Sequence, residues 1–209
     1  MIRIYYTALF VIVFASCKSI GQSVAIHLGK DGWKGHLLIK VDSLNGKIHY
    51  YAADCFAKPV STLTKEVKLR LIEQLLKYEQ DTMNCYKPVN KLSPLVTQLK
   101  KPVSDSFRIQ VDALVLINLI ALGSDVFVYS PYPVLVLKGT GQEISDQKYI
   151  SVVYAVYKKW LANLRANNFE NYTPPNLSEV GIGWFRGAFE TRLYKKPAEW
   201  SSYFDCIEL

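Results

Sequence analysis

The stretch VDALVLINLIAL, residues 111–122, decides the fold, because a helix built from it is apolar on nearly every side. A helix that is hydrophobic all round is normally buried at the centre of a protein. We therefore predict a central buried helix over residues 105–122, with Ile117 in the core. Asp112 and Asn118 are its polar exceptions. Together with its length, they argue against a membrane span, which needs about 20 apolar residues.

Two further helices are predicted, one before and one after this segment. Residues 63–80 carry apolar side chains at helical spacing, although Lys68 falls within their arc. The other helix starts near Ser145 or Asp146, since either side chain can cap it. Its apolar positions fall within about 100° of one another: Ile150, Val153, Tyr154, Tyr157, Leu161 and Leu164.

The N-terminal quarter of the chain has the pattern of a small sheet. Residues 24–28, 36–41 and 48–52 are rich in the residues that strands favour. Leu44-Asn45-Gly46-Lys47 stands between the last two segments, and Asn-Gly suits a type I′ turn because both central positions need a positive φ. These segments predict a small N-terminal antiparallel sheet or hairpin.

The C-terminal half predicts a second, shorter hairpin. Residues 126–129 and 134–137 are strand candidates, and the turn at 138–141 leads the chain back through 143–144. From residue 171 onwards the sequence is aromatic and interrupted by Pro and Gly, which indicates an irregular tail. The predicted fold class is therefore α+β, with a small sheet packed against about three helices.

Residues 1–16 have the pattern of a secretory signal peptide: one positive charge, an apolar run and then small residues. The run ends at Phe14-Ala15-Ser16-Cys17, which resembles the lipobox of bacterial lipoproteins. The resemblance implies that Cys17 is lipidated and becomes the mature N-terminus. Residues 17–209 contain no linker long enough to divide them, so we predict a single α+β domain there. An alternative cut would release a soluble chain that begins at Gln22.

The net charge of the chain is compatible with a location in the cell envelope. The sequence has 25 Lys and Arg against 18 Asp and Glu, a net charge of +7, and removal of the leader takes away one arginine and leaves +6. No run of five or more basic residues occurs, so we predict no nucleic-acid partner. The expected partners are a membrane, through the lipid anchor, and an envelope protein or polysaccharide. The expected location is the cell envelope, lipid-anchored or periplasmic, with secretion as the alternative.

The three histidines, His27, His36 and His49, all fall on the predicted N-terminal strands. Neighbouring strands could bring them to one metal ion, but no HxH or HxxxH pair occurs among them. We interpret them as half-exposed strand residues. The sequence also contains no G-x-S-x-G motif, P-loop or dinucleotide fingerprint. It therefore predicts no metal or cofactor.

A cysteine nucleophile would need a base from upstream in the chain, because no histidine follows His49. The order of His36 and Cys85 is similar to that of circularly permuted NlpC/P60-like thiol hydrolases, in which a strand histidine precedes the cysteine. The resemblance implies a nucleophile at Cys85 with His36 as its base. Cys55 is the other candidate nucleophile.

The same cysteines could instead form a disulfide in an oxidising compartment. Cys55 and Cys85 flank the first predicted helix, and a bridge between them would close a loop of about 30 residues, worth roughly 3 to 4 kcal/mol in the chain-entropy model. Cys206 could pair with either of them and hold down the tail. The sequence leaves these pairings open.

The leading hypothesis from the sequence is an exported, lipid-anchored envelope protein with a non-enzymatic binding or structural role. One alternative is a thiol hydrolase that acts on envelope peptides through Cys85 or Cys55 with His36. Another is an inhibitor or immunity protein that neutralises a secreted toxin. The reactivity of the cysteine thiols in the native protein separates the first two of these functions.

Overall fold

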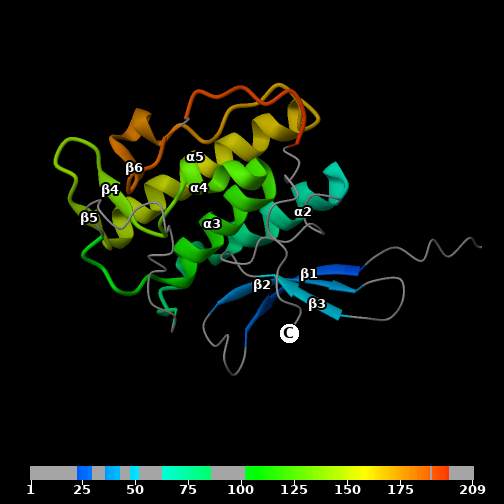
Figure 1. Cartoon of the computed structure of the whole chain (residues 1–209), viewed down its shortest axis with the longest axis horizontal. Helices are drawn as coiled ribbons and strands as arrows, with labels where there is room; N and C mark the ends of the chain where they lie inside the picture. Colours follow the sequence, from blue (N-terminus) through cyan, green and yellow to red (C-terminus); the bar gives the residue numbers. More distant parts are fainter. Residues whose placement is uncertain are drawn as a thin grey trace, which may run out of the picture.

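The fold is α+β, as predicted, with two small antiparallel sheets and helices between them (Figure 1). The computed structural model describes residues 23–29, 36–42, 48–51, 63–85, 102–188 and 190–197. The predicted leader, the lipobox with Cys17, and the turn at residues 44–47 lie outside these ranges. The expectations for those segments stay predictions.

The first sheet consists of β1 (Ser23–Leu28), β2 (Leu37–Asp42) and β3 (Ile48–Tyr51), in the order β1-β2-β3 and antiparallel throughout. The central strand β2 buries Leu37, Leu38 and Ile39 in succession. This strand is paired on both edges and also contacts α3. The predicted N-terminal sheet is confirmed.

The first predicted helix is confirmed as α2 (Lys65–Leu75), which continues as the 3-10 helix η2 (Leu76–Gln80). The side chain of Thr64 accepts a hydrogen bond from the backbone N–H of Val67 and so caps the helix start. Lys68, which the pattern placed in the apolar arc, is indeed buried.

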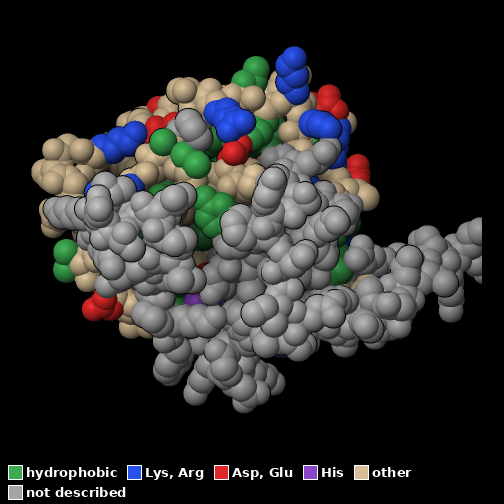
Figure 2. All heavy atoms as spheres, viewed as in Figure 1, with side chains coloured by type: hydrophobic (Ala, Val, Ile, Leu, Met, Phe, Trp, Pro, Cys, Tyr) green, Lys and Arg blue, Asp and Glu red, His purple; other side chains and the backbone are tan. Residues whose placement is uncertain are grey.

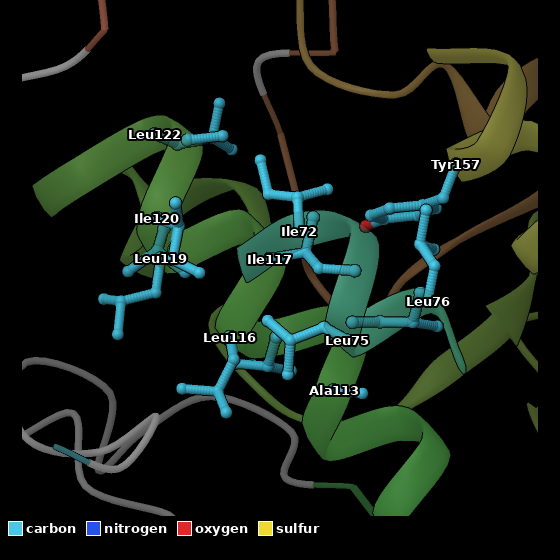
Figure 3. Packing of buried hydrophobic residues seen from close by; sticks show 14 of the residues in the cluster. Ile72, Leu75, Leu76, Ala113, Leu116, Ile117, Leu119, Ile120, Leu122 and Tyr157 are labelled. Carbon is cyan, nitrogen blue, oxygen red and sulfur yellow. The ribbon is translucent and has the colours of Figure 1, made fainter. Parts of the chain in front are cut away.

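The central helix α3 (Ile109–Leu122) is buried along its whole length, as the sequence predicts. Figure 3 shows its side chains projecting on different sides, with Ile117 near Ile72 of α2 and with Leu119 directed away from it. A single helix thus supplies apolar surface to α2 on one side and to other parts of the core on the other. Ile117 is fully buried, as expected.

Residues 126–129 form the short helix α4 (Val126–Tyr129), so the predicted strand is wrong. It follows α3 through the 3-10 turn η4 (Gly123–Asp125). Val126 and Tyr129 are buried, whereas the two residues between them are exposed. Burial three positions apart is helical spacing, and packing against α3 outweighs the strand preference of these valines. The stretch 109–129 is long and apolar enough to cross a membrane, but most of it is buried inside the protein.

The third helix, α5 (Gln147–Ala166), begins where the sequence predicts, since the side chain of Asp146 accepts a hydrogen bond from the backbone N–H of Lys148. All six predicted apolar positions of this helix are buried, and Trp160 joins them. On its polar side, ion pairs link Lys158 to Glu79 of η2 and Arg165 to Glu73 of α2. Figure 2 shows basic and acidic side chains interspersed over this part of the visible surface.

The second sheet contains the predicted hairpin, β4 (Leu135–Leu137) with β5 (Glu143–Ile144). It also contains β6 (Ile182–Trp184), which pairs with the other edge of β4 to give the order β5-β4-β6. The tail is therefore more regular than predicted. The strand forms because its residues are buried against the core, which periodicity over three residues cannot reveal.

Candidate functional site

Three chemically reactive side chains from distant parts of the sequence meet beneath the first sheet: His36, Cys85 and Asp112. One potential ligand atom from each lies within 4.8 Å of the other two, and all three residues are buried. His36 directly precedes β2, Cys85 follows η2, and Asp112 lies in the first turn of α3. We refer to them as the His–Cys–Asp cluster.

Backbone hydrogen bonds place Cys85 beside the start of α3. The N–H of Cys85 donates to the carbonyl of Phe107 at 2.8 Å, and the N–H of Ile109 donates to the carbonyl of Met83 at 2.9 Å. These bonds form a short antiparallel bridge just before the helix. Since the bridge fixes the backbone on both sides of Cys85, its thiol is held close to the first turn of α3.

Asp112 ties the first sheet to the central helix. Its Oδ2 accepts a hydrogen bond of 2.7 Å from the backbone N–H of Leu37 in β2. The carboxylate is 1% exposed, and its place in the first turn of a helix suits a negative charge. This bond fixes the orientation of the carboxylate toward β2, the strand that directly follows His36.

His36 is 4% exposed, so the interpretation of it as a half-exposed strand residue is wrong. The ring packs edge-on against Phe107, with 5.8 Å between centroids. Its Nδ1 lies 3.7 Å from Oδ2 of Asp112, which is beyond hydrogen-bond length. Within the described parts of the chain, Nε2 is buried and has no hydrogen-bond partner. A buried imidazole nitrogen normally has such a partner.

Cys85 carries a free thiol that is 3% exposed. Burial raises the pKa of this thiol above its ordinary value, and the carboxylates of Asp112 and Asp81 raise it further. The thiol, in contrast to a thiolate, is a poor nucleophile. Burial and the neighbouring carboxylates therefore both favour the thiol form of Cys85 over the thiolate.

The three groups form a triangle, which differs from a catalytic relay. In a relay the imidazole stands between thiol and carboxylate, because each partner binds a different ring nitrogen. Two hydrogen bonds of about 2.8 Å alone would then separate thiol and carboxylate by more than about 5.6 Å. Here the atoms of Cys85 and Asp112 lie within 4.8 Å of each other. Such mutual proximity suits a set of ligands around one ion.

An open hollow of about 570 Å³ lies between β1 and the α2–η2 segment. Its lining residues are Ala25, Ile26, Gln74, Lys77, Tyr78 and Asp81. None of the three cluster residues lines it. Asp81, which lines this hollow, also raises the pKa of Cys85 through its charge.

The structure thus brings His36 and Cys85 together, as the order of these residues in the sequence suggested, and adds Asp112. Sequence reasoning missed Asp112 as a site residue. The available signal was an acidic residue inside an otherwise apolar, buried helix. His27 is half-buried on β1 and is not part of the cluster.

The other residues singled out from the sequence lie outside the described side chains. These are Cys17, Cys55 and Cys206, together with the side chain of His49. Cys85 is unpaired in this structure. The disulfide between Cys55 and Cys85 and the lipidation of Cys17 stay predictions.

The chain matches no protein-family model, no curated protein and no solved structure. The interpretation of the His–Cys–Asp cluster therefore depends on its own geometry and chemistry.

Proposed function

We propose that this protein is exported and lipid-anchored in the cell envelope, where it has a non-enzymatic binding or structural role. The sequence of residues 1–17 supports the location. The burial of Cys85 supports the role, since a nucleophilic thiol must reach its substrate and this one is 3% exposed. Its position beside Asp112, on the same side of the imidazole, supports the same conclusion.

The reactivity of Cys85 tests this role. The native protein is treated with a thiol reagent at neutral pH, and the modified cysteines are assigned by mass spectrometry with Cys85→Ser as the matched control. We expect Cys85 to react only after denaturation. Rapid modification of Cys85 in the native protein would contradict a non-enzymatic role.

The anchor is tested by the intact mass of cell-associated protein. We expect a chain that lacks residues 1–16 and carries lipid on Cys17. Because two or more acyl chains hold a protein firmly on a bilayer, high salt should leave it bound. Cys17→Ser should abolish the lipid. An unlipidated wild-type chain beginning at Gln22 would exclude the anchor, and a chain retaining Met1 would exclude export as well.

A thiol hydrolase is the second candidate function, and the convergence of His36 with Cys85 favours it. In this function His36 would accept the thiol proton as the Cys85 sulfur attacks the carbonyl carbon of an envelope peptide. The C–N bond would break, the amine would leave with that proton, and water would hydrolyse the thioester to restore the thiol. An electrophilic peptide probe tests it directly. Covalent labelling of Cys85 that is lost in His36→Ala, while His27→Ala retains it, would support the hydrolase over the non-enzymatic role.

A further inference from the structure

We propose that His36, Cys85 and Asp112 bind a divalent transition-metal ion of the zinc class. This inference goes beyond the proposed function, which assigns no ligand to the cluster. It rests on the mutual spacing of the three side chains, on their donor atoms and on the unsatisfied polarity of His36. The remaining coordination position is open to water or another ligand.

The spacing fits ligands of one tetrahedral ion. With bonds of about 2.0–2.3 Å to nitrogen, oxygen and sulfur, two ligand atoms on zinc stand roughly 3.3–3.7 Å apart. Nδ1 of His36 and Oδ2 of Asp112 are already 3.7 Å apart. No pair in the cluster exceeds 4.8 Å, so closure around an ion requires a contraction of at most about 1.5 Å. Side-chain rotation supplies a movement of this size.

The donor set suits zinc better than a hard cation. One imidazole nitrogen, one thiolate sulfur and one carboxylate oxygen are all ordinary zinc ligands, whereas calcium and magnesium prefer oxygen alone. The charges also balance, because a thiolate and a carboxylate together neutralise a divalent ion beside a neutral imidazole. Neutrality matters at a site where all three ligands are buried.

Two features of the surroundings point to a ligand. The bond from the Leu37 N–H holds the Asp112 carboxylate, as second-shell bonds do in metal sites. His36 is 4% exposed, has one nitrogen without a partner in the described chain and has the other beyond hydrogen-bond distance of Asp112. A metal ion bound to one of these nitrogens would give the ring a polar bond of a strength that none of the described residues provides.

Binding would change the state of Cys85. As the bond between sulfur and metal forms, the thiol proton passes to solvent, and no oxidant or reductant is involved. The ion would then join three segments that are distant in sequence, which should raise the unfolding temperature. Release of about one proton for each ion bound would accompany the reaction.

Titration of chelator-treated protein with Zn²⁺ and with Co²⁺ tests the proposal. We expect one equivalent of either ion to bind, a higher unfolding temperature, and a thiolate-to-cobalt absorption band. Cys85→Ser should lose this band and bind at least 10-fold more weakly. His36→Ala should also bind at least 10-fold more weakly. Cys55→Ser, Cys206→Ser and His27→Ala are the matched controls and should bind like the wild type.

Three results would overturn the proposal: no stoichiometric binding, a cobalt spectrum without the thiolate band, or wild-type binding by folded Cys85→Ser. If Cys85→Ser does not fold, the cobalt spectrum of the wild-type protein decides, because the controls identify which thiol is responsible. Failure of this test leaves the anchored, non-enzymatic role intact, since that role is tested by thiol accessibility and lipid mass.

Discussion

The buried polar groups near the two ends of helix α3 differ in their hydrogen bonding. Near its C-terminal end, Asn118 donates to Ser130 Oγ at 3.0 Å and accepts from the Tyr157 hydroxyl at 2.7 Å. That hydroxyl in turn accepts a 3.3 Å bond from the indole N–H of Trp184. Near the N-terminal end, the His–Cys–Asp cluster leaves Nε2 of His36 without a partner among the described residues.

The polar groups around Asn118 are hydrogen-bonded within the protein, whereas one nitrogen of His36 has no such partner among the described residues. A buried network in which every group is hydrogen-bonded fixes one packing arrangement and has no capacity left for a ligand. A buried group without a partner costs free energy, so its persistence requires an explanation such as an ion. On this comparison, the hydrogen bonds of Asn118 help to hold the fold together, whereas the unpartnered nitrogen of His36 belongs to the cluster that we propose binds a metal ion.

The largest expected effect is the loss of the Asn118 amide. Asn118→Ala removes the acceptor of the buried Tyr157 hydroxyl and the donor to Ser130 Oγ, at about 1–3 kcal/mol each. We expect the free energy of unfolding to fall by about 3–5 kcal/mol, measured by chemical denaturation. A loss below about 1 kcal/mol would mean that this network does not hold the fold.

Ile117 provides the apolar reference for that comparison, because it is fully buried one residue before Asn118. Ile117→Ala should lower the free energy of unfolding by about 2–5 kcal/mol, as core truncations do. Lys158→Ala is the control. Its ion pair with Glu79 lies on the surface and contributes less than about 1 kcal/mol. Equal effects in thermal unfolding would show that the helix faces are wrongly assigned.

Alkaline pH should weaken the Asn118 end in particular. Burial raises the pKa of Tyr157 above its ordinary value of 10, and burial does the same for Tyr129. The contribution of these tyrosines to the free energy of unfolding is therefore fully present below pH 10. Above pH 10 it falls, because the tyrosines ionise in the unfolded chain, by up to about 1.4 kcal/mol per pH unit for each tyrosine. Denaturation at several pH values should give a shallower decline for Tyr157→Phe than for the wild type.

The smallest effect is expected at the other end of the helix. Because His36 has an unsatisfied nitrogen, replacing it with an apolar side chain removes a cost as well as contacts. In the presence of a chelator, His36→Leu should remain within about 1 kcal/mol of the wild type in denaturant unfolding. A loss approaching that of Asn118→Ala would show that both ends are structural.

Periodicity in the sequence was sufficient for much of the fold. The spacing within 147–166 and the continuous hydrophobicity of 111–122 depend on local pattern, and both helices were predicted. Residues 126–129 were assigned wrongly, since four residues with two valines fit either a strand or a helix turn. Strand β6 was missed because its partner β4 lies far upstream. The pairing is a long-range contact that no local pattern contains.

The candidate site was predicted in part for the same reason. The order of His36 and Cys85 suggested a pair, but nothing local connects either residue to Asp112. The bond between Leu37 and Asp112 spans 75 residues. The burial of His36 could not be predicted either, because alternation along a strand assigns side chains to faces and does not indicate which face another element covers.

The position of β6 also determines when the chain can finish folding. Its pairing partner β4 is made some 45 residues earlier, so one edge of β4 stays open until the tail arrives. Contacts between segments so far apart form slowly. A chain that ends before residue 182 would expose that edge and lack Trp184, the donor to Tyr157. Open strand edges pair with those of other chains, so C-terminal truncation should lead to aggregation rather than to a smaller stable protein.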